Sequence, residues 1–148
     1  MWVTGFFYYL ATTIKNNNMH KYGFPLKEHL KSKSIIERLY AQGTSATAYP
    51  LRAVFLELQP HEQEAVATIL ISVAKRRFRH AVDRNLMKRR IREAYRLNKP
   101  TFVEKLAEQN KKLAIAILYI DNKHSNTEYL LRKMQKLLTA IIEKSEKQ

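Results

Sequence analysis

The 148-residue sequence contains no cysteine and only three glycines, and both shortages narrow the range of functions. Without cysteine, the chain cannot form a disulfide framework, a thiolate zinc site, an iron–sulfur site or a cysteine nucleophile. Its glycines, Gly5, Gly23 and Gly43, are too scattered for a phosphate-binding loop, a dinucleotide fingerprint or a serine-hydrolase elbow. They also leave no match to the glycine-dependent signatures of the RRM and KH modules. The two counts therefore exclude the enzyme classes that depend on cysteine chemistry or on a glycine-rich nucleotide-binding loop.

Long hydrophobic runs are also scarce. Residues 2–14 are nearly uncharged and mostly apolar, but this segment is shorter than the about 20 residues of a membrane-spanning helix. It shows neither the leading positive charge nor the clear cleavage site of a signal peptide. Met19 opens a segment that is similar in composition to the rest, so translation from Met19 is an alternative. We expect one domain over residues 19–148, with residues 1–18 an extension or a misassigned start, and a cytoplasmic protein without a membrane partner.

Acidic residues are few compared with basic ones. The chain has 27 Lys and Arg against 13 Asp and Glu, which gives a formal net charge of +14. An excess of this size favours a polyanionic partner. The hydrophobic fraction of 45% is that of a folded domain rather than a disordered polymer.

Hydrophobic spacing and capping motifs predict an α-β-β-α-β-α order and an α+β fold, in which a small sheet is packed against helices. We expect strands 51–58 and 66–74 to pair antiparallel across the turn at residues 59–62. Ser34, Thr101 and Ser125 are each followed three residues later by Glu, which is the capping-box pattern of a helix start. The expected elements are a helix over 34–42, strands over 51–58 and 66–74, a helix over 84–97 that Pro100 ends, a short helix over 101–109, a buried strand over 113–120 and a helix from 125 to about 142.

Residues 75–99 carry eleven Lys and Arg against Asp83 and Glu93, so this segment has a net charge of +9. In the helix over 84–97, the cationic face lies opposite the apolar positions Met87, Ile91 and Ala94. Like charges at positions 84, 88, 92 and 96 cost a few tenths of a kcal/mol per pair, which a polyanion would offset. We therefore interpret the segment as a nucleic-acid interface. Its candidate residues are Lys75, Arg76, Arg77, Arg79, Arg84, Asn85, Lys88, Arg89, Arg90, Arg92 and Arg96.

We find no residue set suited to cleaving a phosphodiester bond. The five histidines are spread along the chain, and none has a second ligand at the spacing of a metal site. The run His61-Glu62-Gln63-Glu64 lies in a predicted turn and is interpreted as solvated surface. The sequence therefore predicts no catalytic and no metal-binding residues.

The segment from Val73 to Arg96 resembles the signature region of the bacterial ribonuclease P protein subunit. That family carries an Arg-Asn-Arg motif, then Lys-Arg and a further Arg, on a helix after a strand that ends in Ser-Val-(Ser/Ala)-Lys-Lys. Leu86 stands where the family usually has Arg, which leaves one RNA contact open; Arg90, on the same side, is an alternative for part of that role. The resemblance covers roughly residues 24–142. Its matching residues are Ser72-Val73-Ala74-Lys75-Arg76, Arg84-Asn85, Lys88-Arg89 and Arg92.

The resemblance implies the function of that family. The chain would bind the catalytic RNA and the 5′ leader of precursor tRNA, and would promote the endonucleolytic removal of the leader. Magnesium ions would be held chiefly by the RNA, the catalytic groups would lie there too, and no obligate protein partner is expected. The implied fold is a ribosomal-protein-like two-layer sandwich with a left-handed β-α-β crossover through the basic helix.

By the same resemblance, the leader would lie in a cleft between the first helix and the sheet. The expected residues are Ile36, Tyr40, Phe55, Ser72 and Lys75. Tyr40 keeps the stacking capacity of the family's aromatic residues, whereas Ile36 loses it. For Ile36 and Phe55, core packing is the alternative, and the register of Phe55 is open to a neighbouring residue.

Three other functions remain as alternatives. A structural RNA-binding protein of the ribosomal type would explain both the charge and the missing active site. A DNA-binding regulator would need a helix-turn-helix, but the basic helix lies between two predicted strands. A nuclease acting alone would need a metal-binding set of carboxylates that the sequence lacks.

Overall fold

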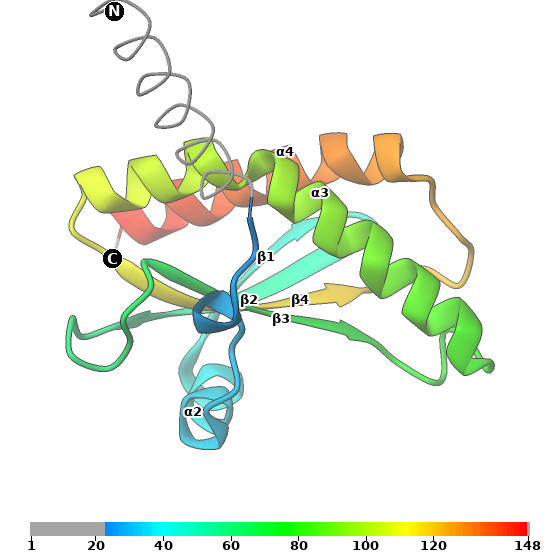
Figure 1. Ribbon diagram of the computed structural model, residues 1–148, viewed down its shortest axis with the longest axis horizontal. Helices are drawn as coiled ribbons and strands as arrows, with labels where there is room; N and C mark the ends of the chain where they lie inside the picture. The colour runs from blue at the N-terminus through cyan, green and yellow to red at the C-terminus, as the bar shows by residue number, and fades with distance from the viewer. Residues whose placement is uncertain (1–22, 148) are drawn as a thin grey trace, which may run out of the picture.

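The computed structural model describes residues 23–147, so the expected extension over residues 1–18 lies outside the described residues. Figure 1 shows the arrangement of the elements. In chain order they are η1 (Leu26–Glu28), α2 (Lys33–Gln42), β1 (Thr44–Ala48), β2 (Leu51–Leu58), β3 (Ala67–Val73), α3 (Ala81–Glu108), β4 (Lys112–Tyr119) and α4 (Thr127–Glu146). Within residues 23–147, no helix has the length and apolar character needed to cross a bilayer.

The sheet is mixed and has the strand order β1-β2-β4-β3. β2 is antiparallel to both β1 and β4, whereas β3 is parallel to β4. The expected antiparallel pairing of strands 51–58 and 66–74 is therefore wrong, because β4 lies between them. β4 is apolar on both faces, with Leu113 to Ile117 fully buried, as a central strand requires. The parallel β3-α3-β4 unit was expected; the left hand of its crossover stays a prediction.

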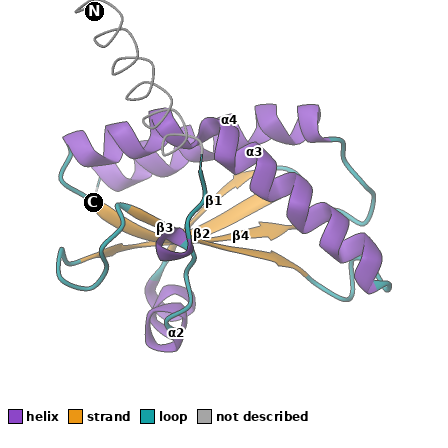
Figure 2. Cartoon of the chain, in the orientation of Figure 1, coloured by secondary structure: helices purple, strands orange, loops and turns teal. Residues whose placement is uncertain are grey.

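Helices cover both faces of the sheet (Figures 1 and 2). α3 and α4 lie over one face and enclose the larger core, in which Phe55, Ile115 and Ile117 meet Tyr95 and Phe102. α2 lies on the opposite face over a smaller core. That core contains Leu30, Ile35, Leu39, Leu58, Ala114 and Ala116. The predicted α+β class, a small mixed sheet packed against helices, is confirmed.

α3 is one helix of 28 residues with Pro100 inside it, so the predicted helix end at Pro100 is wrong. A proline in a helix interior removes one backbone hydrogen bond and costs about 3 kcal/mol. The buried side of α3 nevertheless continues past it, with Phe102 and Leu106 packed into the same core as Met87 and Ile91. This burial outweighs the local cost.

The helix starts differ in detail from the predicted capping boxes. Ser32 caps α2, without a side-chain hydrogen bond, and Asn126 caps α4 by accepting the Tyr129 backbone N–H at 2.8 Å. Ser125 is buried instead, with its hydroxyl 2.9 Å from that of Tyr119. The short strand β1 was missed, because its sequence, Thr-Ser-Ala-Thr-Ala, lacks large apolar residues.

Candidate nucleic-acid interface

The exposed side of α3 is cationic, as its sequence predicted. Met87 and Ile91 are fully buried, while Asn85, Arg89 and Arg92 are exposed and Lys88 is half-buried. These four polar residues form no ion pair or side-chain hydrogen bond with another residue in the described range. With Val82 and Leu86, they line an open depression of about 520 Å³. We call this surface the α3 cationic face.

Three other basic residues of α3 are held by the protein itself. Arg84 donates to the carbonyl oxygens of Phe78 and Arg79 at 2.9 and 3.0 Å, and Arg90 donates to the Ser125 carbonyl at 2.9 Å. Arg96 pairs with Glu93, and this hydrogen bond holds the pKa of the Glu93 carboxyl below its usual value. Arg84, Arg90 and Arg96, which were predicted to contact RNA, thus also form contacts within the protein.

The loop between β3 and α3 adds further positive charge. Lys75, Arg76 and Arg79 are exposed, while Arg77 donates to the Asn122 side-chain oxygen at 3.2 Å. The loop is anchored by the buried Phe78, whose ring centroid lies 5.8 Å from that of Tyr119 and 4.9 Å from that of His124. The basic loop therefore leads from the end of β3 into the α3 cationic face.

Lys99, the last cation of the basic segment, does not reach the surface. It is 4% exposed, and its ammonium nitrogen lies 2.6 Å from a carboxylate oxygen of Glu28. Lys99 was included in the charge of the basic segment, but it is buried and pairs with Glu28 instead of facing solvent.

A second surface lies where α2 leaves the sheet uncovered. Ile36 is half-buried and Tyr40, one helical turn later, is 52% exposed. Beyond α2, the strand register places Arg52, Leu118 and Ser72 side by side in one row. Arg52 is exposed, and the other two are partly exposed. We call the surface formed by these five residues the open sheet face.

Phe55 does not belong to the open sheet face, so that prediction is wrong. Its side chain is 1% exposed and packs in the core under α3 and α4. Because side chains alternate along a strand, the neighbours Val54 and Leu56 lie on the α2 side, partly buried against its core. The residues of β2 that face α2 are therefore the neighbours of Phe55, one position before and one after it.

The end of α2 lies very close to β2, and Gly43 makes this possible. A Cβ atom on Gly43 would lie 2.6 Å from Val54 Cγ1 and would also collide with the Leu39 carbonyl oxygen. Real Cβ contacts are never this short, so a side chain here would push α2 away from the sheet. Gly43 thus lets the end of α2, which carries Tyr40, lie close against β2.

Arg52 was missed in the sequence, although a signal for it existed. It lies in β2 between Leu51 and Ala53, which are both fully buried on the α3 and α4 side. The alternation of strands places a charged residue at this position on the opposite face. Ser72 lies in the same row, and Lys75 lies in the loop that follows β3; their contact with the leader stays a prediction.

The described residues offer no metal centre. Within residues 23–147, no three His, Asp or Glu side chains gather in a way that could hold an ion. Glu62 instead closes a turn: it accepts the Gln59 backbone N–H at 2.8 Å and binds Arg38. These two contacts hold the pKa of the Glu62 carboxyl below its usual value.

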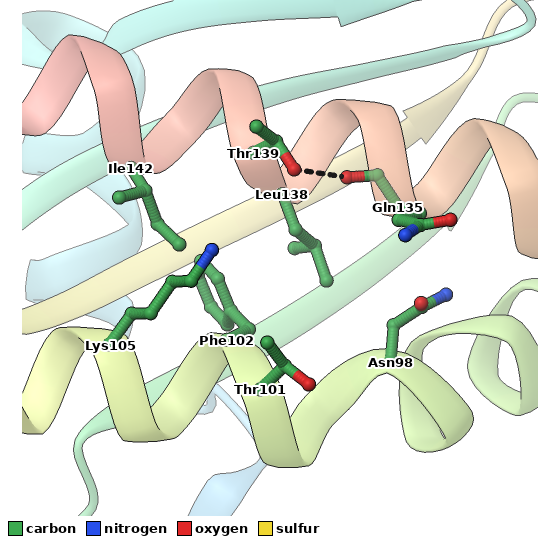
Figure 3. Close-up of a pocket in the computed structure, with 8 residues that line it drawn as sticks. All are labelled: Asn98, Thr101, Phe102, Lys105, Gln135, Leu138, Thr139 and Ile142. Atoms are coloured by element: carbon green, nitrogen blue, oxygen red, sulfur yellow. Dashed lines mark hydrogen bonds between the residues drawn. The ribbon is translucent and has the colours of Figure 1, made fainter.

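A small pocket of about 110 Å³ lies between α3 and α4 (Figure 3). It is lined by Asn98, Thr101, Phe102, Lys105, Gln135, Leu138, Thr139 and Ile142. Thr139 donates its hydroxyl to the Gln135 carbonyl at 2.9 Å. Lys105 is the only charged group in this lining, so the pocket presents no catalytic constellation.

Comparison with known proteins relates these surfaces to one family. The family model for ribonuclease P matches residues 24–142. The ribonuclease P protein component of Porphyromonas gingivalis is 37% identical over 120 residues, which cover 81% of this chain and 87% of that protein. That of Chlorobaculum tepidum is 34% identical over 101 residues, or 64% of this chain and 66% of that protein.

A solved structure agrees at the level of the fold. The RNase P protein of Staphylococcus aureus superimposes with a TM-score of 0.60 at 21% sequence identity, over 76% of this chain and 93% of that one. The matched range includes the basic loop, the α3 cationic face and the open sheet face. The chain therefore belongs to the family of ribonuclease P protein components, the protein subunits of tRNA 5′-end processing.

Proposed function

We propose that this chain binds the RNA subunit of ribonuclease P through the α3 cationic face and holds the 5′ leader of precursor tRNA on the open sheet face. In this way it promotes endonucleolytic removal of the leader. The observation that carries the proposal is the row of unpaired cations on α3. Arg89 and Arg92 are exposed and have no acidic partner in the described range, while the opposite side of the helix is committed to the core.

Phosphate groups fit this row for an electrostatic reason. Like charges three or four residues apart on a helix repel one another, and bound phosphates relieve that repulsion. Arginine also donates two parallel hydrogen bonds to one phosphate, which a lysine cannot do. The basic loop at residues 75–79 extends the same charge toward the end of β3.

The open sheet face fits a single strand. Unpaired nucleotides bind where an aromatic ring offers a stacking surface beside positive charge, with little sequence preference. Tyr40 supplies the ring, Arg52 supplies exposed charge, and Ser72 supplies a hydroxyl. Lys75 adds exposed charge from the loop that follows β3. A precursor tRNA has such a single strand in its leader, whereas mature tRNA lacks it.

We place the reacting groups and the magnesium ions in the RNA subunit. The described residues bring together no set of acidic or histidine side chains suited to the ion. The role of the protein is then to bind and position RNA. The partners in this account are the catalytic RNA and the precursor tRNA, with no obligate protein partner.

The test is the binding of the catalytic RNA by Arg89→Ala and Arg92→Ala at several salt concentrations. Each loss of a phosphate contact should weaken binding and lower the slope of log K against log salt by about 0.7 to 0.9. Lys136→Ala, which removes an exposed cation of α4, is the matched control and should change neither quantity. Unchanged affinity and slope in both Arg variants would overturn the assignment of α3.

A further inference from the structure

A second exposed tyrosine lies at the end of the sheet, away from α2. Tyr49, in the turn between β1 and β2, is 55% exposed, which is as much as Tyr40. The Pro50 carbonyl accepts the Ile120 backbone N–H at 2.9 Å, so this turn is held against the end of β4. A single exposed tyrosine is common on protein surfaces. Whether it belongs to a binding site depends on the residues around it.

Charged and aromatic residues of two other segments lie near the Tyr49 turn. Asn122, two residues after Ile120, accepts a hydrogen bond from Arg77 at 3.2 Å, which brings the basic loop to the same end of the sheet. On α4, the Lys133 ammonium lies 5.4 Å from the centroid of the partly exposed Tyr129 ring. Partial desolvation and the Asp121 carboxylate raise the pKa of Tyr49. Arg77 opposes this rise, and Tyr129 adds to it slightly. Asp121, Arg77 and Tyr129 thus lie close enough to Tyr49 to act on its hydroxyl electrostatically, and Lys133 joins the group through Tyr129.

The charge of this cluster favours an anionic partner. Asp121 is its acidic member, and its carboxylate accepts the backbone N–H groups of Asn122 and Lys123 at 2.7 and 3.3 Å. Arg77 lies beside the residue that follows Asp121, through its hydrogen bond to Asn122, and Lys133 lies over the Tyr129 ring. Lys75 and Arg76, in the loop that carries Arg77, are exposed. Aromatic rings beside cations are the recognition device for unpaired bases of nucleic acids.

The cluster also continues the path of the open sheet face. Arg52 is three residues from Tyr49, so their Cα atoms are at most about 11 Å apart. A strand of RNA that crosses the row of Arg52, Leu118 and Ser72 therefore leaves the sheet close to Tyr49. A leader long enough to pass from Tyr40 across this row would reach the Tyr49 turn at the end of the sheet.

We propose that Tyr49 and Tyr129, with Arg77 and Lys133, form a second stacking site for unpaired nucleotides of the distal 5′ leader. This inference rests on the proposed function, because it needs the leader to lie on the open sheet face. It predicts that the protein distinguishes precursors by the length of their leaders. Single-strand sites in other proteins span roughly 4–16 nucleotides, which a longer leader would fill.

The test compares two precursor tRNAs, one with a dinucleotide leader and one with a leader of about ten nucleotides. Their dissociation constants are measured with the complete complex of protein and catalytic RNA. Tyr49→Ala and Tyr129→Ala should each weaken binding of the long-leader precursor about five-fold or more, and should leave the short-leader precursor unchanged. Tyr49→Phe and Tyr129→Phe keep the ring and should bind as the original chain does.

The remaining outcomes separate this inference from the proposed function. If the Ala variants bind both precursors as the original chain does, while Tyr40→Ala weakens precursor binding, the second site is overturned and the proposed function stands. If Tyr40→Ala has no effect either, the leader assignment fails as a whole. If the Ala variants bind the two precursors equally weakly, or lose the catalytic RNA, the leader is not the ligand and the inference is overturned.

Discussion

The ammonium group of Lys99 lies 2.6 Å from the Glu28 carboxylate and 2.6 Å from the Gly23 carbonyl oxygen. This contact fixes the segment before α2 to the middle of α3. The side chains of Lys99 and Glu28 are 5% and 14% exposed, so the pair is largely desolvated. Burial, with a contribution from Glu28, also raises the pKa of the neighbouring Tyr95. Lys99, a cation of the basic segment, thus joins the segment before α2 to α3.

We expect Glu28→Gln to lower the free energy of unfolding by about 3 kcal/mol, because it leaves the buried Lys99 charge without its partner. Urea unfolding measures the change. Glu64→Gln is the matched control, since it removes the partner of Lys27 from an exposed pair 3.6 Å apart. Exposed pairs are screened by water, so this control should lose far less. Equal losses in the two variants would contradict the structural role of Lys99.

Leu86→Arg should tighten binding of the catalytic RNA. Leu86 is partly exposed and lies beside Asn85 and Arg89 in the depression on α3. A cation there adds one phosphate contact, so the slope of log K against log salt should steepen by about 0.7 to 0.9. Leu86→Gln, which adds a polar group without charge, should leave the slope unchanged. A steeper slope in both variants, or in neither, would show that this position does not face RNA phosphates.

Tyr40 and Phe55 should behave in opposite ways. Tyr40→Ala should reduce the preference for precursor over mature tRNA, and Tyr40→Phe should retain it, because the ring alone is needed for stacking. Phe55→Ala should instead lower the free energy of unfolding by about 3–5 kcal/mol, since it empties space in the core. Competition binding and urea unfolding measure the two effects. A selective loss of precursor binding in a stable Phe55→Ala variant would restore Phe55 to the leader surface.

Glu62 should make stability depend on pH in the acidic range. The Gln59 backbone N–H and Arg38 hold the folded-state pKa of Glu62 below its ordinary value near 4.5. A group with a lowered folded-state pKa contributes its full stability above the unfolded-state pKa and loses it as the pH falls through the folded-state pKa. The difference in unfolding free energy between the original chain and Glu62→Gln should therefore shrink below about pH 4.5. If this difference in unfolding free energy stays constant through that pH range, the Glu62 carboxylate does not stabilise the turn.

Burial and charge were predictable from the sequence, because both leave periodic patterns. The all-apolar run in β4 predicted a strand buried on both faces, and the opposed stripes of α3 predicted its core side and its cationic side. The strand order was not predictable in this way. A hydrophobic pattern states that a strand is buried but does not name its neighbours, so β2 and β3 were paired although β4 separates them.

The errors at single residues have a common physical cause: tertiary contacts override local signals. Pro100 is a helix breaker by its own chemistry, yet the burial of Phe102 and Leu106 carries α3 past it. Lys99 has the composition of a surface cation, but Glu28, about seventy residues earlier in the chain, makes it a buried one. Phe55 was misplaced by the phase of a single strand, which reverses the face of every side chain.

The most direct test of the account is the cleavage of a labelled precursor tRNA by the cognate catalytic RNA at low magnesium concentration, with and without this protein. The proposed function predicts strong stimulation by the protein, with the leader released at the mature 5′ end. It also predicts that Arg89→Ala and Arg92→Ala lose much of that stimulation, whereas Lys136→Ala keeps it. Tight, salt-sensitive RNA binding without any stimulation of cleavage would contradict the account and indicate a structural RNA-binding protein.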